Sequence, residues 1–452
     1  MSRAGRRTLI GGSPRRMLKL SDRAVGMIDD DGRLTVADDG SRSLARTLLD
    51  AGVAHPRPMG GPDCDEVTVV IPVRDNQAGL DRLLAALGDI AVIVVDDGST
   101  IPLTVPDGVR LERFDANRGP AAARNRGAEL AETDFVAFLD SDVVPLAGGD
   151  ERPGRCGDWL TALLGHFSDP SVGLAAPRIV ALPTASPGIV EKYEADFSSL
   201  DMGPREAAVL PGTPVAYVPS AAMVVRRSAF PGFDEELRVA EDVDLCWRMI
   251  DGGWRVRYDP IAQVAHEHRA SMRSMLDRRR FYGTGAALLA DRHGRRAAPM
   301  AMGVPIAAAL VGLLSRTRVG LALAALGVGM AGWRVRKRVG AGNERVAATL
   351  TAQAVGNGLV QVGGAVSRHY WPVALLGAVF SGRLRRLFLG VLVADAAVAW
   401  VRHARAEGRR PRIDPLSFVV LRRLDDLAYG AGLWQGAMRN RDATSLLPVL
   451  SR

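Results

Sequence analysis

A buried strand and an acidic loop are predicted by Phe138-Leu139-Asp140-Ser141-Asp142-Val143-Val144-Pro145. The apolar residues close a strand expected over 134–139, and the carboxylates of Asp140 and Asp142 follow its end. Carboxylates two residues apart on an extended backbone supply hard oxygen ligands that can share one Mg²⁺ or Mn²⁺ and present it to a phosphate. A solvated acidic turn produces the same local pattern. The neighbouring segments therefore have to distinguish a metal site from a surface turn.

Strands and helices alternate around this stretch. The apolar run over 67–71 is typical of a strand buried on both faces of a parallel sheet, and Pro72 is expected to end it. The further expected elements are a helix over 80–87, strands over 90–95 and 111–114, and a helix over 121–130 that begins at Pro120. This alternation predicts βαβ units with right-handed crossovers.

Polar side chains follow three of the predicted strands. Arg74 and Asp75 follow the first, Asp96 and Asp97 end the second, and the acidic loop follows the fourth. Ligands of open α/β sheets bind beyond the carboxyl ends of the strands, where these side chains meet. The convergence favours a pocket over three unrelated surface turns.

The second half of the sheet region is less regular. A helix over 159–167 and strands over 172–176, 215–218, 220–227 and 253–258 are expected, the last of them at an edge. Glu241 and Asp242 stand at a helix start, where the positive end of the helix dipole favours carboxylates; ordinary helix capping explains them equally well. His266 and His268 point to one side of an extended segment and are within reach of a metal held elsewhere, although a pair of surface histidines gives the same pattern.

The composition of the chain limits the classes of molecule that it is expected to bind. The chain has 452 residues, enough for two or three domains, and its net charge of +8 comes mostly from arginines beyond residue 270. This excess favours anionic partners, but no nucleic-acid recognition signature accompanies it, so nucleic acid is not expected. The cysteines Cys64, Cys156 and Cys246 lie far apart and form no paired framework, which predicts a reducing, cytosolic environment. No apolar segment of a secretory signal follows the basic N-terminus.

Residues 1–60 predict a small winged-helix-like module. A helical pattern covers 18–28, a turn follows at 29–32, and a second helix is expected over 44–49. The proline- and glycine-rich stretch 55–62 serves as the linker. Such a module either packs against the following domain or binds a peptide.

The last third of the chain is apolar and arginine-rich. Apolar runs over 300–315, 319–333, 371–380 and 387–401 are flanked by arginines, and each is shorter than the roughly twenty residues that span a bilayer. Short spanning hairpins, interfacial segments and a buried helical bundle all suit such runs. We expect membrane association at the cytoplasmic face over 299–405, followed by a helical tail over 406–452, since the basic flanks agree with the positive-inside rule. A soluble helical domain is the alternative.

Residues 66–285 resemble the inverting family 2 glycosyltransferases, which have a GT-A fold. The resemblance rests on motifs in a fixed order, namely Val69 to Asp75, Val95 to Ser99, Asn117 to Asn125, Phe138 to Asp142, Glu241 to Asp244, and His266. It implies an α/β fold with a mixed sheet and helices on both faces. The Gln-x-x-Arg-Trp motif of the processive members is missing from the sequence, so synthesis of long polymers is not expected.

The same resemblance implies roles for individual residues. Pro72, Asp75, Asp97, Arg124 and Asp140 would line the pocket for the donor nucleotide. Asp140, Asp142 and His266 would hold Mg²⁺ or Mn²⁺, which neutralises the leaving nucleoside diphosphate. His266 is preferred over the alternative ligand His268, because in relatives the ligand usually precedes a serine by the interval between His266 and Ser271. Asp242 would be the general base that deprotonates the acceptor hydroxyl, and one in-line displacement would invert the anomeric centre. Arg278 to Arg280 would clamp phosphates or form a solvated helix face.

A narrower resemblance covers the whole chain. Gly11-Gly12-Ser13-Pro14, Leu20-Ser21, the segment 44–55 and the arginine-rich tail look like the mycofactocin-system glycosyltransferases of actinobacteria. This implies transfer from UDP-glucose to pre-mycofactocin, a peptide-derived acceptor, with a short β-1,4-linked glucose chain as product. A cell-envelope glycosyltransferase acting on a lipid-linked or polysaccharide acceptor is the alternative enzyme. A catalytically silent nucleotide-sugar-binding or scaffold protein is the alternative of another class.

Overall fold

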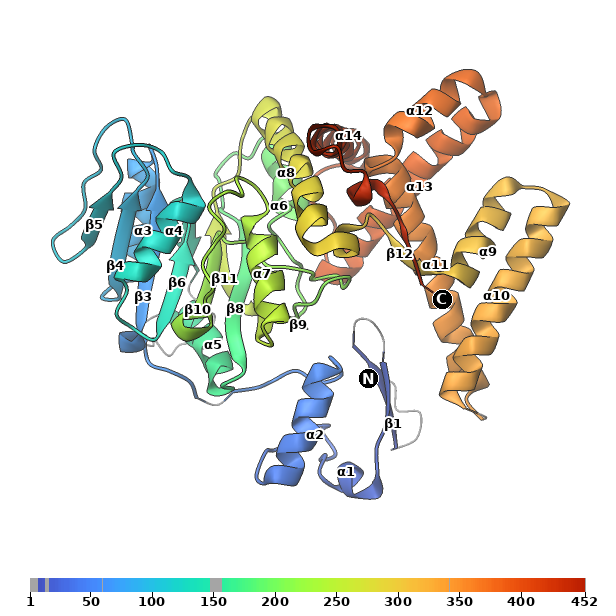
Figure 1. Ribbon diagram of the computed structural model, residues 1–452, viewed down its shortest axis with the longest axis horizontal. Coiled ribbons are helices and arrows are strands. Elements are labelled where there is room, and N and C mark those ends of the chain that lie inside the picture. The colour runs from blue at the N-terminus through green and yellow to red at the C-terminus, as the bar shows by residue number, and fades with distance from the viewer. Residues whose placement is uncertain (1–6, 13–15, 59, 147–156, 341, 452) are drawn as a thin grey trace. The chain divides into compact units, whose positions relative to one another are not determined.

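The computed structural model describes residues 7–12, 16–58, 60–146, 157–340 and 342–451. The chain divides into two compact units, Met1–Ala270 and Ser271–Arg452, whose elements are labelled in Figure 1. This division differs from the expected boundary at residue 285. Helix α8 (Met272–His293) packs along α14 (Pro415–Asn440) and therefore belongs to the second unit.

A nine-stranded mixed sheet forms the centre of the first unit, in the order β5-β4-β3-β6-β10-β8-β11-β7, with β9 paired to β11. The strands are β3 (Val67–Val73), β4 (Ala91–Asp96), β5 (Arg110–Arg113), β6 (Phe135–Leu139), β7 (Val143–Pro145), β8 (Val172–Ala181), β9 (Ala207–Ala208), β10 (Ala222–Arg226) and β11 (Arg255–His266). The neighbours β5, β4, β3 and β6 are parallel, whereas β10 is antiparallel to both β6 and β8. The expected mixed sheet is confirmed.

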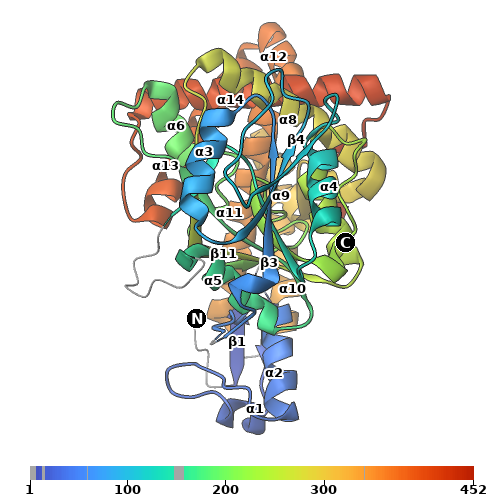
Figure 2. The same cartoon turned by 90° about the vertical axis from the view of Figure 1, so that its left-hand side faces the viewer.

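Helices cover both faces of this sheet. They are α3 (Gln77–Leu87), α4 (Pro120–Leu130), α5 (Gly157–Gly165), α6 (Ile189–Phe197) and α7 (Glu241–Asp251), with short 3₁₀ turns at Cys64–Glu66, His166–Ser168 and Arg227–Ala229. Figure 2 shows α3 and α4 on either side of β3.

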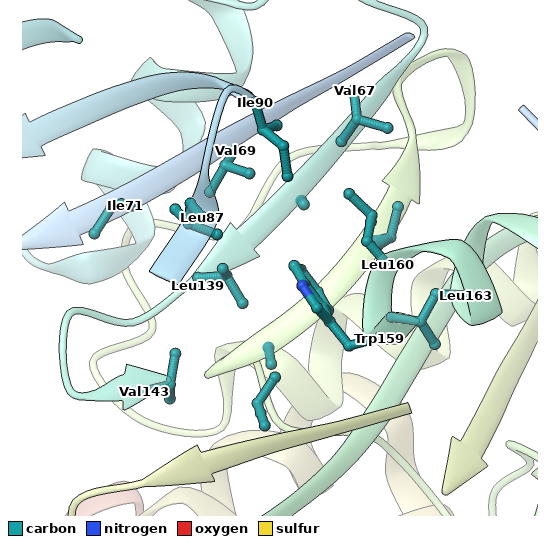
Figure 3. Packing of buried hydrophobic residues seen from close by; sticks show 14 of the residues in the cluster. Val67, Val69, Ile71, Leu87, Ile90, Leu139, Val143, Trp159, Leu160 and Leu163 are labelled. Carbon is teal, nitrogen blue, oxygen red and sulfur yellow. The ribbon is translucent and has the colours of Figure 1, made fainter. Parts of the chain in front are cut away.

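Alternation along β3 explains this layering, because successive side chains of a strand point to opposite faces. Val69 and Ile71 join a buried cluster with residues of α3 and α5, among them Leu87 and Trp159 (Figure 3). Val70 points the other way, toward α4. There Gly127 leaves room for it, since a Cβ atom at that position would overlap the valine side chain.

Three expectations about the strands were wrong. Pro72 lies inside β3 and is paired with Val95, not at the end of the strand. Strand β6 pairs only with the first part of β3, through Val70, so β3 has a neighbour on one side at Pro72 and a residue without N–H is tolerated. The segment 215–218 is a loop, and the expected edge strand at 253–258 belongs to the longer β11, which has β8 on one side and β7 and β9 on the other.

The N-terminal module (residues 7–54) is a hairpin followed by two helices. Its elements are β1 (Thr8–Gly11), β2 (Arg16–Lys19), α1 (Asp22–Gly26) and α2 (Asp39–Asp50), and its small core gathers Leu9, Leu48, Ala51 and Val53. The helical pattern expected from residue 18 is wrong at its start, because Leu18 pairs with Leu9 across the hairpin. Ser13 and Pro14 of the quoted motif lie outside the described residues.

The second unit is helical. Beside α8 and α14 it contains α9 (Val304–Ser315), α10 (Arg318–Val339), α11 (Glu344–Arg368), α12 (Trp371–Phe380) and α13 (Gly382–Glu407), with 3₁₀ turns at Gly294–Ala297 and Thr444–Leu446. Two short parallel strands, β12 (Ala301–Gly303) and β13 (Val449–Ser451), pair with each other. Of the helices described, α10 alone is long and apolar enough to cross a membrane, judged by length and composition. Its 22 residues exceed the expected short run because the helix continues through basic residues beyond Trp333.

Among the cysteines of the described residues, Cys246 is free and buried. Cys156 lies outside the described residues.

Candidate active site

The loops that follow three parallel strands are hydrogen-bonded to one another at one edge of the sheet. The Asp75 carboxylate accepts a hydrogen bond from the Thr100 backbone N–H at 2.7 Å, which joins the loops after β3 and β4. The Asn76 amide donates to the Ser141 hydroxyl at 3.0 Å, which joins the loop after β3 to the acidic loop. The predicted convergence of the strand ends is therefore present.

Asp75 occupies an unusual backbone conformation at this edge. Its φ of 52° lies in the left-handed region, which aspartate tolerates better than most residues. The hydrogen bond from Thr100 lowers the pKa of its half-exposed carboxyl, so the group is ionised at neutral pH. Pro72, by contrast, is buried within β3 and offers no polar side chain to a nucleotide.

The Asp96–Asp97 pair is held by protein groups. Asp96 is fully buried and accepts hydrogen bonds from Arg113 at 2.5 Å and from the Ser99 N–H at 2.8 Å. Asp97 accepts from the backbone N–H groups of Arg118 at 2.6 Å and Gly119 at 2.9 Å. The carboxylate of Asp97 thereby fixes the loop that leads into α4.

Arg124 is the centre of the buried polar network. It lies on α4, is only 2% exposed, and donates to Asp140 at 2.6 Å and to Glu241 at 3.3 Å. Its guanidinium also lies over the ring of Phe233, 5.3 Å from the ring centre. Arg124 therefore links the acidic loop to the start of α7, and its two carboxylate partners raise its pKa against the opposing effect of burial.

The two carboxylates of the acidic loop differ in their partners. Burial and the neighbouring charge of Asp142 raise the pKa of Asp140, although Arg124 opposes the shift. Burial also acts to raise the pKa of Asp142, but its interaction with His266 outweighs this and lowers the pKa. Nε2 of His266 lies 3.4 Å from Oδ2 of Asp142, and the pKa of this histidine is raised against its burial.

The donor atoms at this position suit a divalent cation. Within the described chain, Oδ1 of Asp142 and Nδ1 of His266 are buried without a hydrogen-bond partner. Carboxylate oxygen and imidazole nitrogen are ligands that Mn²⁺ accepts, and oxygen suits Mg²⁺. No group of three or more His, Cys, Asp or Glu residues among those described forms a complete metal-binding cluster, since Asp140 is turned toward Arg124. His266 fits the site better than His268, whose ring nitrogen lies 4.0 Å from Glu194.

Asp242 lies at the start of α7, two residues after a strained position. Ala240 has a φ of 63°, a left-handed conformation that costs free energy for alanine. Burial, and then the adjacent charge of Glu241, raise the pKa of Asp242 to about 7. A carboxylate with such a pKa is matched to general-base work near neutral pH.

Sequence reasoning missed Glu241 as part of the site. Its adjacency to Asp242 was the available signal, but helix capping explained it equally well.

The arginines Arg278 to Arg280, the candidate phosphate clamp, belong to the helical unit. Arg279 is buried and pairs with Asp425 at 3.2 Å, and Arg280 donates to Gln435 at 3.0 Å.

Comparison with known proteins defines the class of this site. Residues 68–230 match the model of glycosyl transferase family 2, and residues 157–403 match that of glycosyl transferase family group 2. The chain belongs to the family 2 glycosyltransferases, and its mixed sheet is the GT-A arrangement expected of them.

Three individual proteins show how similar this chain is to known glycosyltransferases. The chain is 46% identical to the pre-mycofactocin glycosyltransferase of Mycobacterium tuberculosis, over 98% of its own length and 94% of that protein. It is 26% identical to the O-antigen chain rhamnosyltransferase RfbN of Salmonella typhimurium, over 49% of its own length and 71% of that protein. Among solved structures, the mannosyltransferase PcManGT from Pyrobaculum calidifontis, in complex with GDP-Man and Mn²⁺, is 19% identical with a TM-score of 0.37, over 71% of this chain and 88% of that one.

Proposed function

We propose that this glycosyltransferase transfers glucose from UDP-glucose to pre-mycofactocin and builds a short β-1,4-linked oligoglucose chain. The observation that carries the proposal is the 46% identity to the pre-mycofactocin glycosyltransferase, which extends over nearly the full length of both proteins. An identity that includes the N-terminal module and the helical unit supports a shared acceptor as well as a shared sheet domain.

The chemical step would be an inverting displacement. Ionised Asp242 takes the proton of the acceptor hydroxyl while the acceptor oxygen attacks the anomeric carbon, and the nucleoside diphosphate leaves from the opposite side. The proton ends on the Asp242 carboxyl, and the bond to the diphosphate breaks as the new glycosidic bond forms. Arg124 positions Asp140 and Glu241 through its two hydrogen bonds.

Asp142 and His266 would hold the divalent cation, with Asp140 beside them. When bound, Mg²⁺ or Mn²⁺ supplies positive charge against the diphosphate leaving group. Asp75 and the loop fixed by Asp97 would form the pocket for the nucleotide. The half-exposed carboxyl of Asp75 supports this, because it is held in place yet open to a ligand.

The N-terminal module would hold the peptide-derived acceptor. Its contacts with the sheet domain support this role, since Arg46 pairs with Asp169 at 2.8 Å and Asp50 accepts from Arg255 at 2.9 Å. These ion pairs attach the module at α2 and leave its hairpin for other contacts. The helical unit would associate with the cytoplasmic membrane, with the sheet domain in the cytosol.

A cell-envelope glycosyltransferase is the second candidate. The similarity to an O-antigen rhamnosyltransferase and the exposed apolar helices of the second unit favour an acceptor that resides in the membrane. Purified protein, incubated with UDP-glucose and Mn²⁺ and offered either pre-mycofactocin or a lipid-linked acceptor, distinguishes the two by mass spectrometry. We expect successive additions of hexose to pre-mycofactocin. Addition to the lipid-linked acceptor alone would overturn the proposal.

A further inference from the structure

Two helical hairpins of the second unit expose large apolar side chains. The first consists of α9 and α10 and the second of α12 and α13; Figure 1 shows each as a pair of adjacent helices. Val319 and Leu326 on α10 are 80% and 62% exposed, and Phe380 on α12 and Val393 on α13 are 82% and 61% exposed. Exposed apolar residues on this scale mark an interaction surface.

These apolar residues form stripes. On α10, one face carries Val319, Leu323, Leu326, Met330 and Trp333, which recur at intervals of three and four residues. On α13 the stripe runs along Leu389, Val393 and Val401, away from Asp395, which pairs with Arg423 of α14 at 2.7 Å. The side of α13 that carries Asp395 therefore faces its own unit, and the apolar stripe remains without a partner in the described chain.

Arginines stand at the tips of both hairpins. Arg316 follows the end of α9 and Arg318 begins α10, and Arg383 and Arg385 lie in the first turn of α13, directly after α12. The guanidinium of Arg383 donates to the Ser315 carbonyl at 2.9 Å, so the two tips touch. Apolar stripes bounded by cations fit an anionic bilayer, where arginine side chains reach the phosphates and the apolar side chains enter the acyl region.

Helix lengths argue against a crossing. With 12 residues, α9 is about 18 Å long, well short of the roughly 30 Å hydrocarbon core. The hairpin is antiparallel, because Gly312 lies against Gly320 near the tip and Gly327 lies against Pro305 near the base. If α10 crossed the bilayer, β12 at the base of α9 would lie inside the hydrocarbon with the open edges of its two-stranded sheet, and lipid does not tolerate such edges. The arginines of the tip would also have to cross.

We propose that the α9–α10 and α12–α13 hairpins lie in the interfacial layer of one leaflet of an anionic bilayer, without crossing it. The inference rests on the membrane association proposed above and specifies its surface, its depth and its lipid class. It differs from the assignment of α10 as a spanning helix, which length and composition alone permit.

Flotation with vesicles tests the proposal in the absence of any sugar donor or acceptor. The full chain is mixed with vesicles of phosphatidylcholine, or of phosphatidylcholine and phosphatidylglycerol in equal parts. We expect flotation with the anionic vesicles and at least about tenfold weaker binding by Leu326→Asp or Val393→Asp, because a carboxylate in the acyl region is costly. The matched control is Ile261→Asp, which places the same charge at a 69% exposed isoleucine of the sheet domain and should bind like the parent chain. Equal binding to both vesicle types, or unchanged binding by both hairpin variants, would overturn the proposal.

Two further measurements distinguish the proposal from a bilayer crossing and from dimerisation through the stripes. A cysteine in place of Thr317, an exposed residue of the turn between α9 and α10 and not part of the apolar stripe, should react with a membrane-impermeant maleimide added outside the vesicles; protection until detergent is added would show a crossing and overturn the proposal. If a second copy of the chain covers the stripes instead, Leu326→Asp will abolish a dimer in sedimentation and leave flotation unchanged. Transfer of glucose to a soluble acceptor, measured without vesicles, should be the same for Leu326→Asp and the parent, so failure of membrane binding is distinguishable from failure of the proposed activity.

Discussion

Arg124 shows how one side chain couples the parts of the site. It joins Asp140 on the acidic loop to Glu241 on α7, a residue 117 positions away in the sequence. A hydrogen bond between buried charged groups is costly to leave incomplete, so removing Arg124 would leave two carboxylates without their cation. The arginine therefore holds the carboxylates of Asp140, in the acidic loop, and of Glu241, the neighbour of the base Asp242, at fixed places.

Asp242→Asn is expected to abolish transfer and preserve nucleotide binding. Asparagine has nearly the size of aspartate and keeps an oxygen to accept from the Val243 N–H, now at 2.8 Å, but it cannot take a proton from the acceptor. Mass spectrometry of the product and calorimetry with UDP check the two parts. Turnover equal to that of the parent enzyme would end the assignment of Asp242 as the base.

The same substitution should stabilise the fold at alkaline pH. Because the folded-state pKa of Asp242 is raised to about 7, the folded protein holds a proton that the unfolded chain has lost, and stability falls as the pH rises from about 4 to about 7. Asparagine removes this loss. The melting temperature of Asp242→Asn should therefore exceed that of the parent clearly at pH 8 and little at pH 4, as thermal unfolding in the two buffers will report.

Glu241→Gln is expected to shift the pH profile of the reaction to lower pH. The charge of Glu241 disfavours ionisation of Asp242, so its removal lowers the pKa of the base. The acidic limb of the kcat/KM profile should move down from about 7. Glu236→Gln, at an exposed position outside the network, is the matched control and should leave the limb in place. An unmoved limb in Glu241→Gln would contradict the coupling.

At the scale of elements, helix packing in the second unit depends on glycine. Helices α8 and α14 approach so closely that a Cβ atom at Gly432 would overlap the carbonyl of Arg280. Gly432→Ala should therefore destabilise the unit by about 1–3 kcal/mol, the usual cost of overpacking. On α10, Gly329 has nothing near its missing Cβ, and Gly329→Ala should be neutral or stabilising by up to about 1 kcal/mol. Chemical unfolding of the two variants measures the difference, and equal midpoints would show that the contact is dispensable.

Elements formed by local pattern were predictable, and those formed by distant pairing were not. The apolar runs of β3 and β6 and the helix beginning at Pro120 follow directly from the residues. The segment 215–218 looks like a strand, but its carbonyls accept from Trp247 and Cys246 of α7, so it remains a buried loop.

For the site, too, local sequence pattern predicted some residues and missed those joined by distant contacts. The carboxylates at the strand ends were predictable from their positions after apolar runs. The backbone partners of Asp97 and the link from Arg124 to Glu241 were not, because they join loops and helices that only the tertiary fold brings together. The role of Asp97 as an anchor of the loop before α4 is visible only in those contacts.

At the scale of the whole molecule, the N-terminal module and the sheet domain meet through complementary charges. Arg46 and Asp50 of α2 face Asp169 and Arg255, and Arg57 of the linker holds Glu206 with two hydrogen bonds of 2.8 and 2.5 Å. Contacts of this kind give specificity of orientation more than strength. These ion pairs therefore orient the module on the domain.

Arg46→Glu should loosen the module, and Arg46→Glu combined with Asp169→Arg should restore it. Partly exposed ion pairs contribute about 0.2–1 kcal/mol, so hydrogen exchange of the α2 amides should quicken about two- to fivefold in the single variant. The difference in exchange rate between the parent and the single variant should shrink in high salt, which screens exposed charges.

The ion pair also depends on pH. Although burial opposes it, the bond to Arg46 lowers the pKa of Asp169 to about 2, so the stabilisation by this ion pair is complete above about pH 4 and is lost as the pH falls toward 2. Exchange that is the same in the parent, the single variant and the charge-swapped pair would mean that the charges do not hold the module on the sheet domain.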